Sequence, residues 1–330
     1  MKKYLMLIIS LIVGMALFSV VIATSDLNNL LGIFEIFSFY KYLLVFSLFF
    51  IIYMVTLARW GMTLDLIGHH VPFAKLLSIR LSEWAFGYIT PFARLGGEPV
   101  MAYLFKKECH IKYRQGIAVI ILNKVLDFTS ALSLSVIGIL FFVIAYSNML
   151  PKKATFVLVL VVLFLSSLVY LFYIKIIKRK GFFSMFTKIF KKTDIHNGIL
   201  LVENELHELF NKKKKKITSA LCISFVIAFL TLVNYKILAV FVGANLTIVQ
   251  VIMVFAFLVV AFMVPIPGSL GSMEGAMALA FALMGFSAGQ GIAFALILRS
   301  CELILTGMGS IFFSYYGIKL KGLGPGGSEI

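Results

Sequence analysis

Residues 91–102 read PFARLGGEPVMA, and residues 267–278 read PGSLGSMEGAMA. The two segments share a proline, a glutamate, a methionine and an alanine in the same order and at the same spacing. Each segment interrupts a long apolar stretch with proline and glycine, the residues that fit least well inside a helix. The pattern therefore predicts two broken helices in a duplicated chain.

The duplication continues downstream of both breaks. The sequence QGIA occurs at residues 115–118 and again at residues 290–293. Nine residues after each glutamine stands a cation, and three residues later an acid. These charged residues are Lys124, Asp127, Arg299 and Glu302. Because all matches are displaced by 175 or 176 residues, we divide the single integral membrane domain, 1–330, into repeat halves of about 40–147 and about 217–318.

The composition excludes a soluble enzyme or nucleic-acid module. Of the 330 residues, 61% are hydrophobic and 13% are charged, whereas soluble domains have about 45–50% and about 25%. Several apolar runs are long enough to cross a hydrocarbon core of about 30 Å. We expect an all-α polytopic membrane protein with about six to eight spanning helices, broken or re-entrant helices and an inverted repeat.

The basic residues predict how the chain crosses the membrane. The chain has 30 Lys and Arg against 14 Asp and Glu, a net charge of +16. These bases lie in short loops between apolar runs, as in cytosolic loops of membrane proteins, so a nucleic-acid partner is not needed to explain them. We expect a multi-pass protein of the plasma membrane with cytosolic termini and a cytosolic insertion at 175–216. The loops 243–247 and 286–289 are expected outside, which orients the two halves in opposite directions.

The insertion at 175–216 is the largest polar segment of the chain. Apolar residues recur at helical spacing between Ile195 and Phe210, which predicts an amphipathic cytosolic helix. The run Lys212–Lys216 that follows either attracts anionic lipids, at about 1 kcal/mol per base, or only sets the topology. The glycine-rich tail, 322–330, is expected to be disordered.

The charges after the QGIA motifs are expected near the bilayer midplane. Nine helical residues advance about 13.5 Å, so Lys124 and Arg299 reach about half of a 30 Å core from opposite edges. Ionisable groups at such depth usually mark a pathway or a binding site. In the alternative, Lys124 with Asp127 and Arg299 with Glu302 form neutral i,i+3 pairs that only pack the bundle.

The breaks contribute the other charged groups. Glu98 and Glu274 stand at expected helix starts, where free backbone N–H groups favour anions. These glutamates either cap the helices or face an amine or a bound proton, and Arg94 adds a cation. Arg80 and Glu83, two charged residues in the apolar segment before the first break, are weaker candidates for the binding site. Residues expected to shape the breaks are Pro91, Gly96, Gly97, Pro265, Pro267, Gly268 and Gly271.

At these residues the sequence resembles a known family, the flippase-like transmembrane domain of lysylphosphatidylglycerol synthases and its stand-alone relatives. The resemblance rests on TPFARLGGEP at 90–99, NKVLD at 123–127, PIPGSLGSME at 265–274 and Arg299. In the full-length synthases this domain is thought to move an aminoacylated lipid between leaflets, while a soluble domain makes that lipid. The resemblance implies a stand-alone translocation module without synthase activity.

The expected function is translocation of a lipid through a midplane site between the inverted halves. The expected partners are membrane lipids with an anionic or phosphate-bearing headgroup, and a homo-oligomer is compatible with the sequence. The first alternative is a secondary transporter of a small soluble solute. A membrane-embedded enzyme acting on a lipid phosphate is the third reading. The sequence offers that enzyme no metal-ligand cluster and no nucleophile–base motif, so we expect no enzymatic activity, metal or cofactor.

Overall fold

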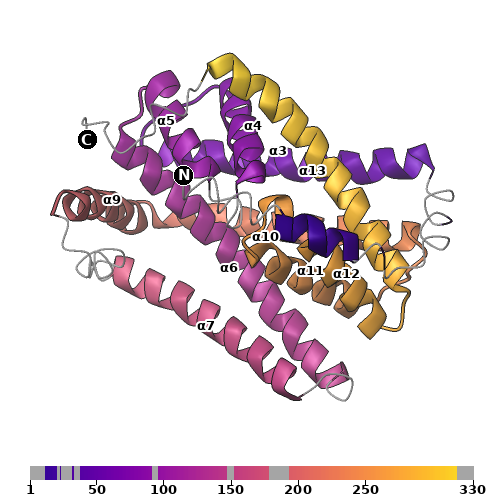
Figure 1. Cartoon of the computed structure of the whole chain (residues 1–330). Helices are drawn as coiled ribbons and strands as arrows, with labels where there is room; N and C mark the ends of the chain where they lie inside the picture. The colour runs from indigo at the N-terminus through magenta and orange to yellow at the C-terminus, as the bar shows by residue number, and fades with distance from the viewer. Residues whose placement is uncertain are drawn as a thin grey trace.

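The computed structural model describes residues 12–20, 23, 32, 38–90, 96–146, 152–177 and 193–317 (Figure 1). This described part is helical and contains no strand, which confirms the expected all-α fold. Its elements are α3 (Phe39–Leu66), α4 (Phe73–Ile89), α5 (Gly97–Cys109), α6 (Tyr113–Tyr146), α7 (Lys152–Ile177), α9 (Thr193–Lys212), α10 (Lys214–Phe241), α11 (Ile248–Met263), the 3-10 turn η2 (Pro267–Ser269), α12 (Ser272–Leu283) and α13 (Ala288–Tyr316).

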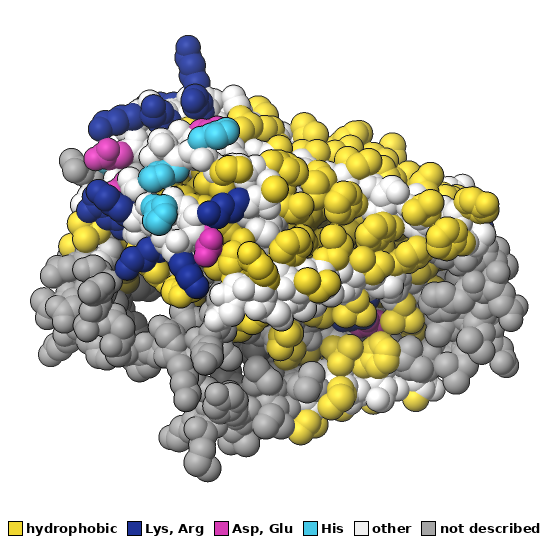
Figure 2. All heavy atoms as spheres, turned by 90° about the horizontal axis from the view of Figure 1, so that it is seen from above, with side chains coloured by type: hydrophobic (Ala, Val, Ile, Leu, Met, Phe, Trp, Pro, Cys, Tyr) yellow, Lys and Arg dark blue, Asp and Glu magenta, His cyan; other side chains and the backbone are white. Residues whose placement is uncertain are grey.

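Four of these helices are long and apolar enough to cross a membrane. They are α3, α10, α13 and the Tyr113–Phe141 part of α6. Charged and histidine side chains gather at one end of the face in Figure 2, whereas hydrophobic side chains cover most of its remaining described surface. The protein is therefore a polytopic membrane protein. The total number of spans and the orientation in the membrane stay predictions.

The helices repeat in the order and spacing of the sequence duplication. Helices α3, α4, α5 and α6 begin at residues 39, 73, 97 and 113, and α10, α11, α12 and α13 begin at 214, 248, 272 and 288. Each second-half helix thus begins 175 residues after its counterpart. Helix α4 packs on α13, its counterpart α11 packs on α6, and α3 packs on α10. The long helices α6 and α13 run in opposite directions (Figure 1).

Close helix crossings depend on glycine. A Cβ added to Gly309 of α13 would overlap the backbone carbonyl oxygen of Leu81 in α4. A Cβ added to Gly138 of α6 would lie 2.8 Å from the carbonyl oxygen of Ile252 in α11. Small residues at such crossings let two helix backbones approach each other. The α4–α13 and α6–α11 contacts therefore each rest on one glycine.

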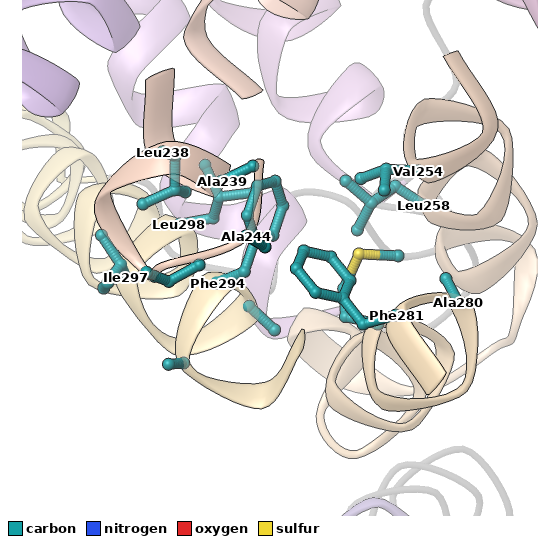
Figure 3. Close-up of a cluster of buried hydrophobic side chains, with 14 of the residues drawn as sticks. Leu238, Ala239, Ala244, Val254, Leu258, Ala280, Phe281, Phe294, Ile297 and Leu298 are labelled. Carbon is teal, nitrogen blue, oxygen red and sulfur yellow. The ribbon is translucent and has the colours of Figure 1, made fainter. Parts of the chain in front are cut away.

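The second half has its own hydrophobic core, drawn in Figure 3. Aromatic rings of α12 and α13 meet in it, with the ring centroids of Phe281 and Phe294 5.5 Å apart. Leu238 of α10 and Leu258 of α11 are buried in the same cluster. This core packs α12, the short helix that follows the second break, against α11 and α13.

The second break itself requires residues in unusual backbone conformations. Between α11 and α12, Gly268 and Gly271 have φ values of +56° and +78°. Side chains disfavour this left-handed region, so glycine is the residue that fits. Pro265 lies just after α11, and Pro267 begins η2.

At the first break, α5 begins at Gly97, and a Cβ there would overlap the carbonyl oxygen of Glu83. Gly96 stands immediately before α5, in the N-cap position. The predicted break residues Pro91 and Arg94 lie outside the described residues.

The helical segment 12–20 packs directly on the second break. A Cβ on Gly14 would lie 2.6 Å from Cγ2 of Ile266, and one on Gly271 would lie 2.6 Å from the backbone nitrogen of Phe18. Two glycines therefore allow this segment to lie against the loop between α11 and α12. The rest of the expected first span, apart from Ala23, lies outside the described residues.

Helix α3 is longer than the sequence suggested. The sequence alone predicts a span of about residues 40–58 that ends at Arg59, because this cation follows an apolar run. This expectation is wrong, because α3 continues to Leu66 and buries Arg59 completely. Neither proline nor positive-φ glycine interrupts the chain before Gly68, where φ is +79°. A charged residue alone does not end a helix when a partner inside the protein compensates it.

The amphipathic helix of the insertion is α9, as predicted, but its apolar face is already covered. Val202, Leu206, Leu209 and Phe210 are buried in a cluster with residues of α6, α7 and α10. This face therefore packs on the protein and not on a bilayer. Lys212–Lys216 are exposed. Residues 178–192 of the insertion and the predicted disordered tail lie outside the described residues.

The helix crossing at Gly309 can be tested by one methyl group. Gly309→Ala should lower the free energy of unfolding by about 1–3 kcal/mol, because the added Cβ forces α13 away from α4. Gly307→Ala is the matched control, since nothing lies within 4 Å of a Cβ there. Thermal unfolding in detergent would measure both, and equal stabilities would contradict the crossing.

The predicted topology can be tested by cysteine labelling from outside the cell. In a variant without the three native cysteines, Asn245→Cys should react with an impermeant maleimide in intact cells. Lys212→Cys should react only after permeabilisation, because the basic segment is expected in the cytosol. Both positions are exposed in the structure. The reverse labelling pattern would overturn the orientation.

Candidate functional site

The glutamate at each break forms an ion pair with the cation of the following long helix. Glu98 Oε1 lies 2.5 Å from Lys124 Nζ, and Glu274 Oε1 lies 2.5 Å from Arg299 Nε. The two pairs occupy equivalent places in the two halves, because the repeat relates Glu98 to Glu274 and Lys124 to Arg299. The structure therefore joins four predicted site residues into two equivalent pairs. In both, the short helix α5 or α12 is held against the long helix α6 or α13.

This pairing differs from the i,i+3 alternative drawn from the sequence. Asp127, three residues after Lys124, pairs with Arg59 of α3 at 2.6 Å. Arg299 binds the carboxylate of Glu274, and Glu302 is buried one turn later on α13. Helical spacing identifies which residues share a face, but a long side chain can also reach a carboxylate on another helix. The partners shown here come from elements distant in sequence.

The second-half pair is closed on all sides. Arg299 makes five hydrogen bonds to acceptors on three elements, which uses all of its N–H donors. Nε donates to Glu274 Oε1 at 2.5 Å, Nη2 to Glu274 Oε2 at 3.0 Å and to Ser269 O at 3.0 Å, and Nη1 to Gly268 O at 2.8 Å and to Tyr88 Oη at 3.0 Å. The side chains of Arg299 and Glu274 are 8% and 0% exposed. Arg299 therefore ties the second break to both α13 and α4.

Glu274 also caps its own helix. Its Oε2 accepts a hydrogen bond of 2.9 Å from the backbone N–H of Gly271 at the start of α12. A carboxylate at this position satisfies a free N–H group and interacts favourably with the helix dipole. The capping alternative for Glu274 is therefore correct, and the same carboxylate also binds Arg299.

The first-half pair is more open. The side chains of Lys124 and Glu98 are 30% and 16% exposed. Among the described residues, Lys124 forms an ion pair with Glu98, whereas the equivalent Arg299 donates to five acceptor atoms. Two equivalent positions thus differ in how much room they leave for another ligand. The first half thus leaves Lys124 more accessible than Arg299, although both carboxylate oxygens of Glu98 are buried.

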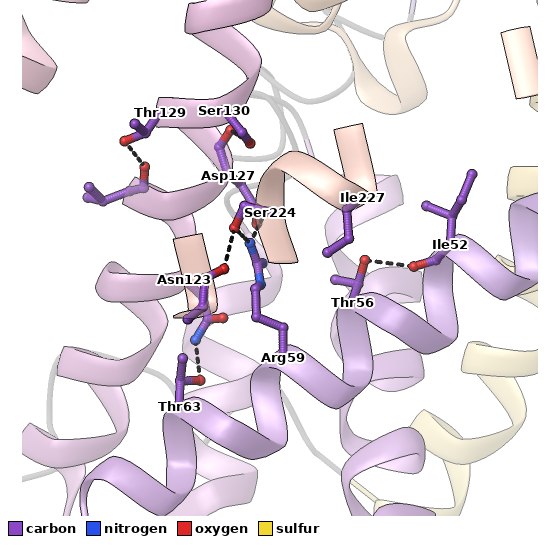
Figure 4. A network of polar contacts seen from close by, with 12 residues as sticks. Ile52, Thr56, Arg59, Thr63, Asn123, Asp127, Thr129, Ser130, Ser224 and Ile227 are labelled. Carbon is purple, nitrogen blue, oxygen red and sulfur yellow. Dashed lines mark hydrogen bonds and ion pairs between the residues drawn. The ribbon is translucent and has the colours of Figure 1, made fainter. Parts of the chain in front are cut away.

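A buried polar layer lies beside the first-half pair, between α3, α6 and α10 (Figure 4). Arg59 Nη1 donates to Ser224 Oγ at 2.5 Å and pairs with Asp127, whose side chain is 46% exposed. Asn123 Nδ2 donates to Thr63 Oγ1 at 2.7 Å. No sequence pattern points to a site role for the four residues of this layer, Arg59, Thr63, Asn123 and Ser224. The one available signal was Arg59, an arginine that is followed by further apolar residues and by no proline before Pro72.

The weaker candidates Arg80 and Glu83 form a separate buried ion pair. Their Nη1 and Oε2 atoms are 2.7 Å apart within α4. The Arg80 guanidinium also lies over the ring of Trp60, 4.5 Å from its centroid. Cation–π contact and an ion pair together account for a buried arginine here. This pair packs α4 against α3.

A metal centre is not part of the site in the described residues, which contain no group of three or more His, Cys, Asp or Glu side chains placed to hold a metal ion. Two cations and their carboxylates at helix breaks can bind a charged group and release it again, without forming or breaking a covalent bond.

Comparison with known proteins agrees with these motifs. Residues 7–309 match the family described as Lysylphosphatidylglycerol synthase TM region. A UPF0104 membrane protein of Methanothermobacter thermautotrophicus is 25% identical over 82% of this chain and 84% of its own length. A UPF0104 membrane protein of Pyrococcus horikoshii is 24% identical over 83% of this chain and 85% of its own. No solved structure matches the chain.

The closed pair makes a sharp stability prediction. Arg299→Met should destabilise the protein by about 3–5 kcal/mol, because it leaves the Glu274 carboxylate buried without its cation. The double variant Arg299→Met/Glu274→Gln should recover much of this loss, since no buried charge remains. Thermal unfolding in detergent would measure both variants. Equal stability of the single and double variants would show that Glu274 does not depend on Arg299.

Proposed function

The chain belongs to the family of the lysylphosphatidylglycerol synthase TM region, and from this premise we propose that it translocates a lipid between the leaflets of the plasma membrane. The observation that carries the proposal is the pair of equivalent glutamate–cation contacts at the two helix breaks. Such breaks place polar groups inside a membrane protein, where discontinuous helices from two repeats form binding sites. Charged groups inside a membrane are costly and usually have a function.

The proposed mechanism separates the polar and apolar parts of the lipid. The headgroup enters beside the first-half pair, and the hydrocarbon chains remain in the bilayer. Lys124 attracts the anionic part of the headgroup, while Glu98 compensates the Lys124 charge when the site is empty. A charged headgroup in bare hydrocarbon loses its hydration at a high cost. The cation replaces part of that hydration during passage.

Access from the side supports a lipid over a soluble solute. Asp127 is 46% exposed although it lies within the apolar Tyr113–Phe141 segment. The next residue, Phe128, is also exposed, at 40%. A polar group and an aromatic ring thus share an outward-facing part of a membrane-length helix. This arrangement suits a molecule that has both a polar head and an apolar tail.

Leaflet exchange of a fluorescent phosphatidylglycerol in reconstituted vesicles tests the proposal. Lys124→Met should reduce the exchange rate by about tenfold or more, the loss expected when one charge-assisted hydrogen bond disappears. Lys124→Met/Glu98→Gln should regain stability but not exchange, because it restores neutrality without restoring the cation. Arg114→Gln on the same helix is the control, since Arg114 pairs with Glu205 of α9.

Wild-type exchange in Lys124→Met/Glu98→Gln would refute the role of the pair in transport and make it purely structural. Exchange by empty vesicles at the rate of vesicles that contain the protein would refute lipid translocation itself. Uptake of a water-soluble solute into the same vesicles, without lipid exchange, would favour the secondary transporter.

A further inference from the structure

Arg59 has hydrogen-bonding capacity that the described residues do not use. Its side chain is fully buried, with 0% exposure. Its Nη1 binds Asp127 and Ser224, but its Nε and Nη2 have no acceptor in the described part of the chain. Buried donors of a charged group are expensive to leave unpaired. Such donors point to an additional acceptor at this place.

The repeat shows that this capacity is not a general requirement of the fold. The residue 175 positions after Arg59 is Asn234, which is buried and uncharged. In the second half the buried arginine is Arg299, and all of its donors are used. The buried cation with unpaired N–H donors, Arg59, thus lies in the first half, whose glutamate–cation pair is the less buried one. The fold tolerates a neutral residue at the equivalent position, so packing alone does not demand Arg59.

A single exposed carboxylate lies between Arg59 and the surface. Asp127 Oδ1 is 2.6 Å from Arg59 Nη1, and the Asp127 side chain is 46% exposed. Figure 4 shows Arg59 extending from α3 toward Asp127 and Ser224. Lys124 lies one helical turn before Asp127, on the same side of α6. An anion that displaces Asp127 would therefore meet Arg59 with Lys124 nearby.

We propose that Arg59 and Lys124 form a phosphate-binding site, and that the Asp127 carboxylate occupies the place of the phosphate while the site is empty. A phosphate offers more acceptor oxygens than the one Asp127 oxygen that binds Arg59 here. These oxygens can pair with Nε and Nη2, because the guanidinium fork matches phosphate geometry. Displaced Asp127 turns toward the exposed side. The inference deepens the proposed function and rests on it, since it names the part of the headgroup that is bound.

Binding to the full-length protein in phosphate-free maltoside micelles tests the site. The probes are inorganic phosphate, a short-chain phosphatidylglycerol and the diacylglycerol of the same chain length. Asp127→Asn should bind the phosphate-bearing probe about tenfold more tightly than the wild type, because the competing carboxylate is gone. Arg59→Met/Asp127→Asn should remain folded, since neither charge is left, and should lose binding by about tenfold or more. Arg114→Gln is the control for a lost surface cation.

Ligand-dependent thermal stability provides a second measurement on the same variants. Asp127→Asn leaves Arg59 buried without its carboxylate, so this variant should be less stable and should be stabilised most strongly by the phosphate probe. Binding of both phosphate probes would support a site for any phosphate, and binding of phosphatidylglycerol alone would assign it to the lipid. Equal binding of diacylglycerol would overturn the proposal. So would Asp127→Asn binding no more tightly than the wild type, or unchanged binding by Arg59→Met/Asp127→Asn.

The leaflet-exchange measurement separates this inference from translocation. Phosphate binding with the expected dependence on Arg59, in a protein that exchanges no lipid, would support the site and refute the translocase. Wild-type exchange by Arg59→Met/Asp127→Asn would refute the phosphate site and leave translocation intact.

Discussion

The arrangement of the helices depends on one constraint: a charge buried between apolar helices must keep its partner. Glu274 and Arg299 show how much follows from it. The carboxylate of Glu274 caps the start of α12, and Arg299 donates two hydrogen bonds to the same carboxylate. The same guanidinium satisfies carbonyl groups of the break, which have no helical partner. An interrupted helix in a membrane protein needs such compensation, because water and lipid cannot supply it there.

The two halves differ in how completely their glutamate–cation pairs are buried. In the second half the pair is enclosed, and segment 12–20 packs on the break beside it. In the first half Lys124 and Glu98 remain partly exposed, next to Arg59 and the exposed Asp127. If the cations of both halves had all their hydrogen-bond donors paired within the protein, the fold would be stable but no donor would be left for a ligand. On the proposed function, the first half would supply the donors for the headgroup, and the enclosed pair of the second half would stabilise the fold around them.

Much of the fold could be predicted from the sequence, because breaks and periodicity are local properties. The spacing P-x6-E-x2-M-A placed the two breaks, and the helix starts follow it. Partners between helices were less predictable. Spacing suggested Asp127 for Lys124, but the structure provides Glu98 for Lys124 and Arg59 for Asp127. The apolar face of α9 was ambiguous for a related reason, since a bilayer and a protein core offer the same apolar surroundings. Tertiary contact, which no local pattern encodes, decided both cases.

The difference between the halves also limits how the molecule can move. Separating α12 from α13 would break the two hydrogen bonds from Arg299 to Glu274 and would strip the break carbonyls of their donor. Separating α5 from α6 breaks the Glu98–Lys124 ion pair, in which a headgroup anion can take the place of the carboxylate beside Lys124. This pair is less enclosed than Arg299 and Glu274, whose side chains are 8% and 0% exposed, so unpairing it costs less than unpairing the fully buried pair. Any opening that admits a headgroup should therefore take place between α5 and α6, with α12 and α13 moving as one unit. On the proposed function, the enclosed Arg299–Glu274 pair would keep the second half together while the first half opens to the headgroup.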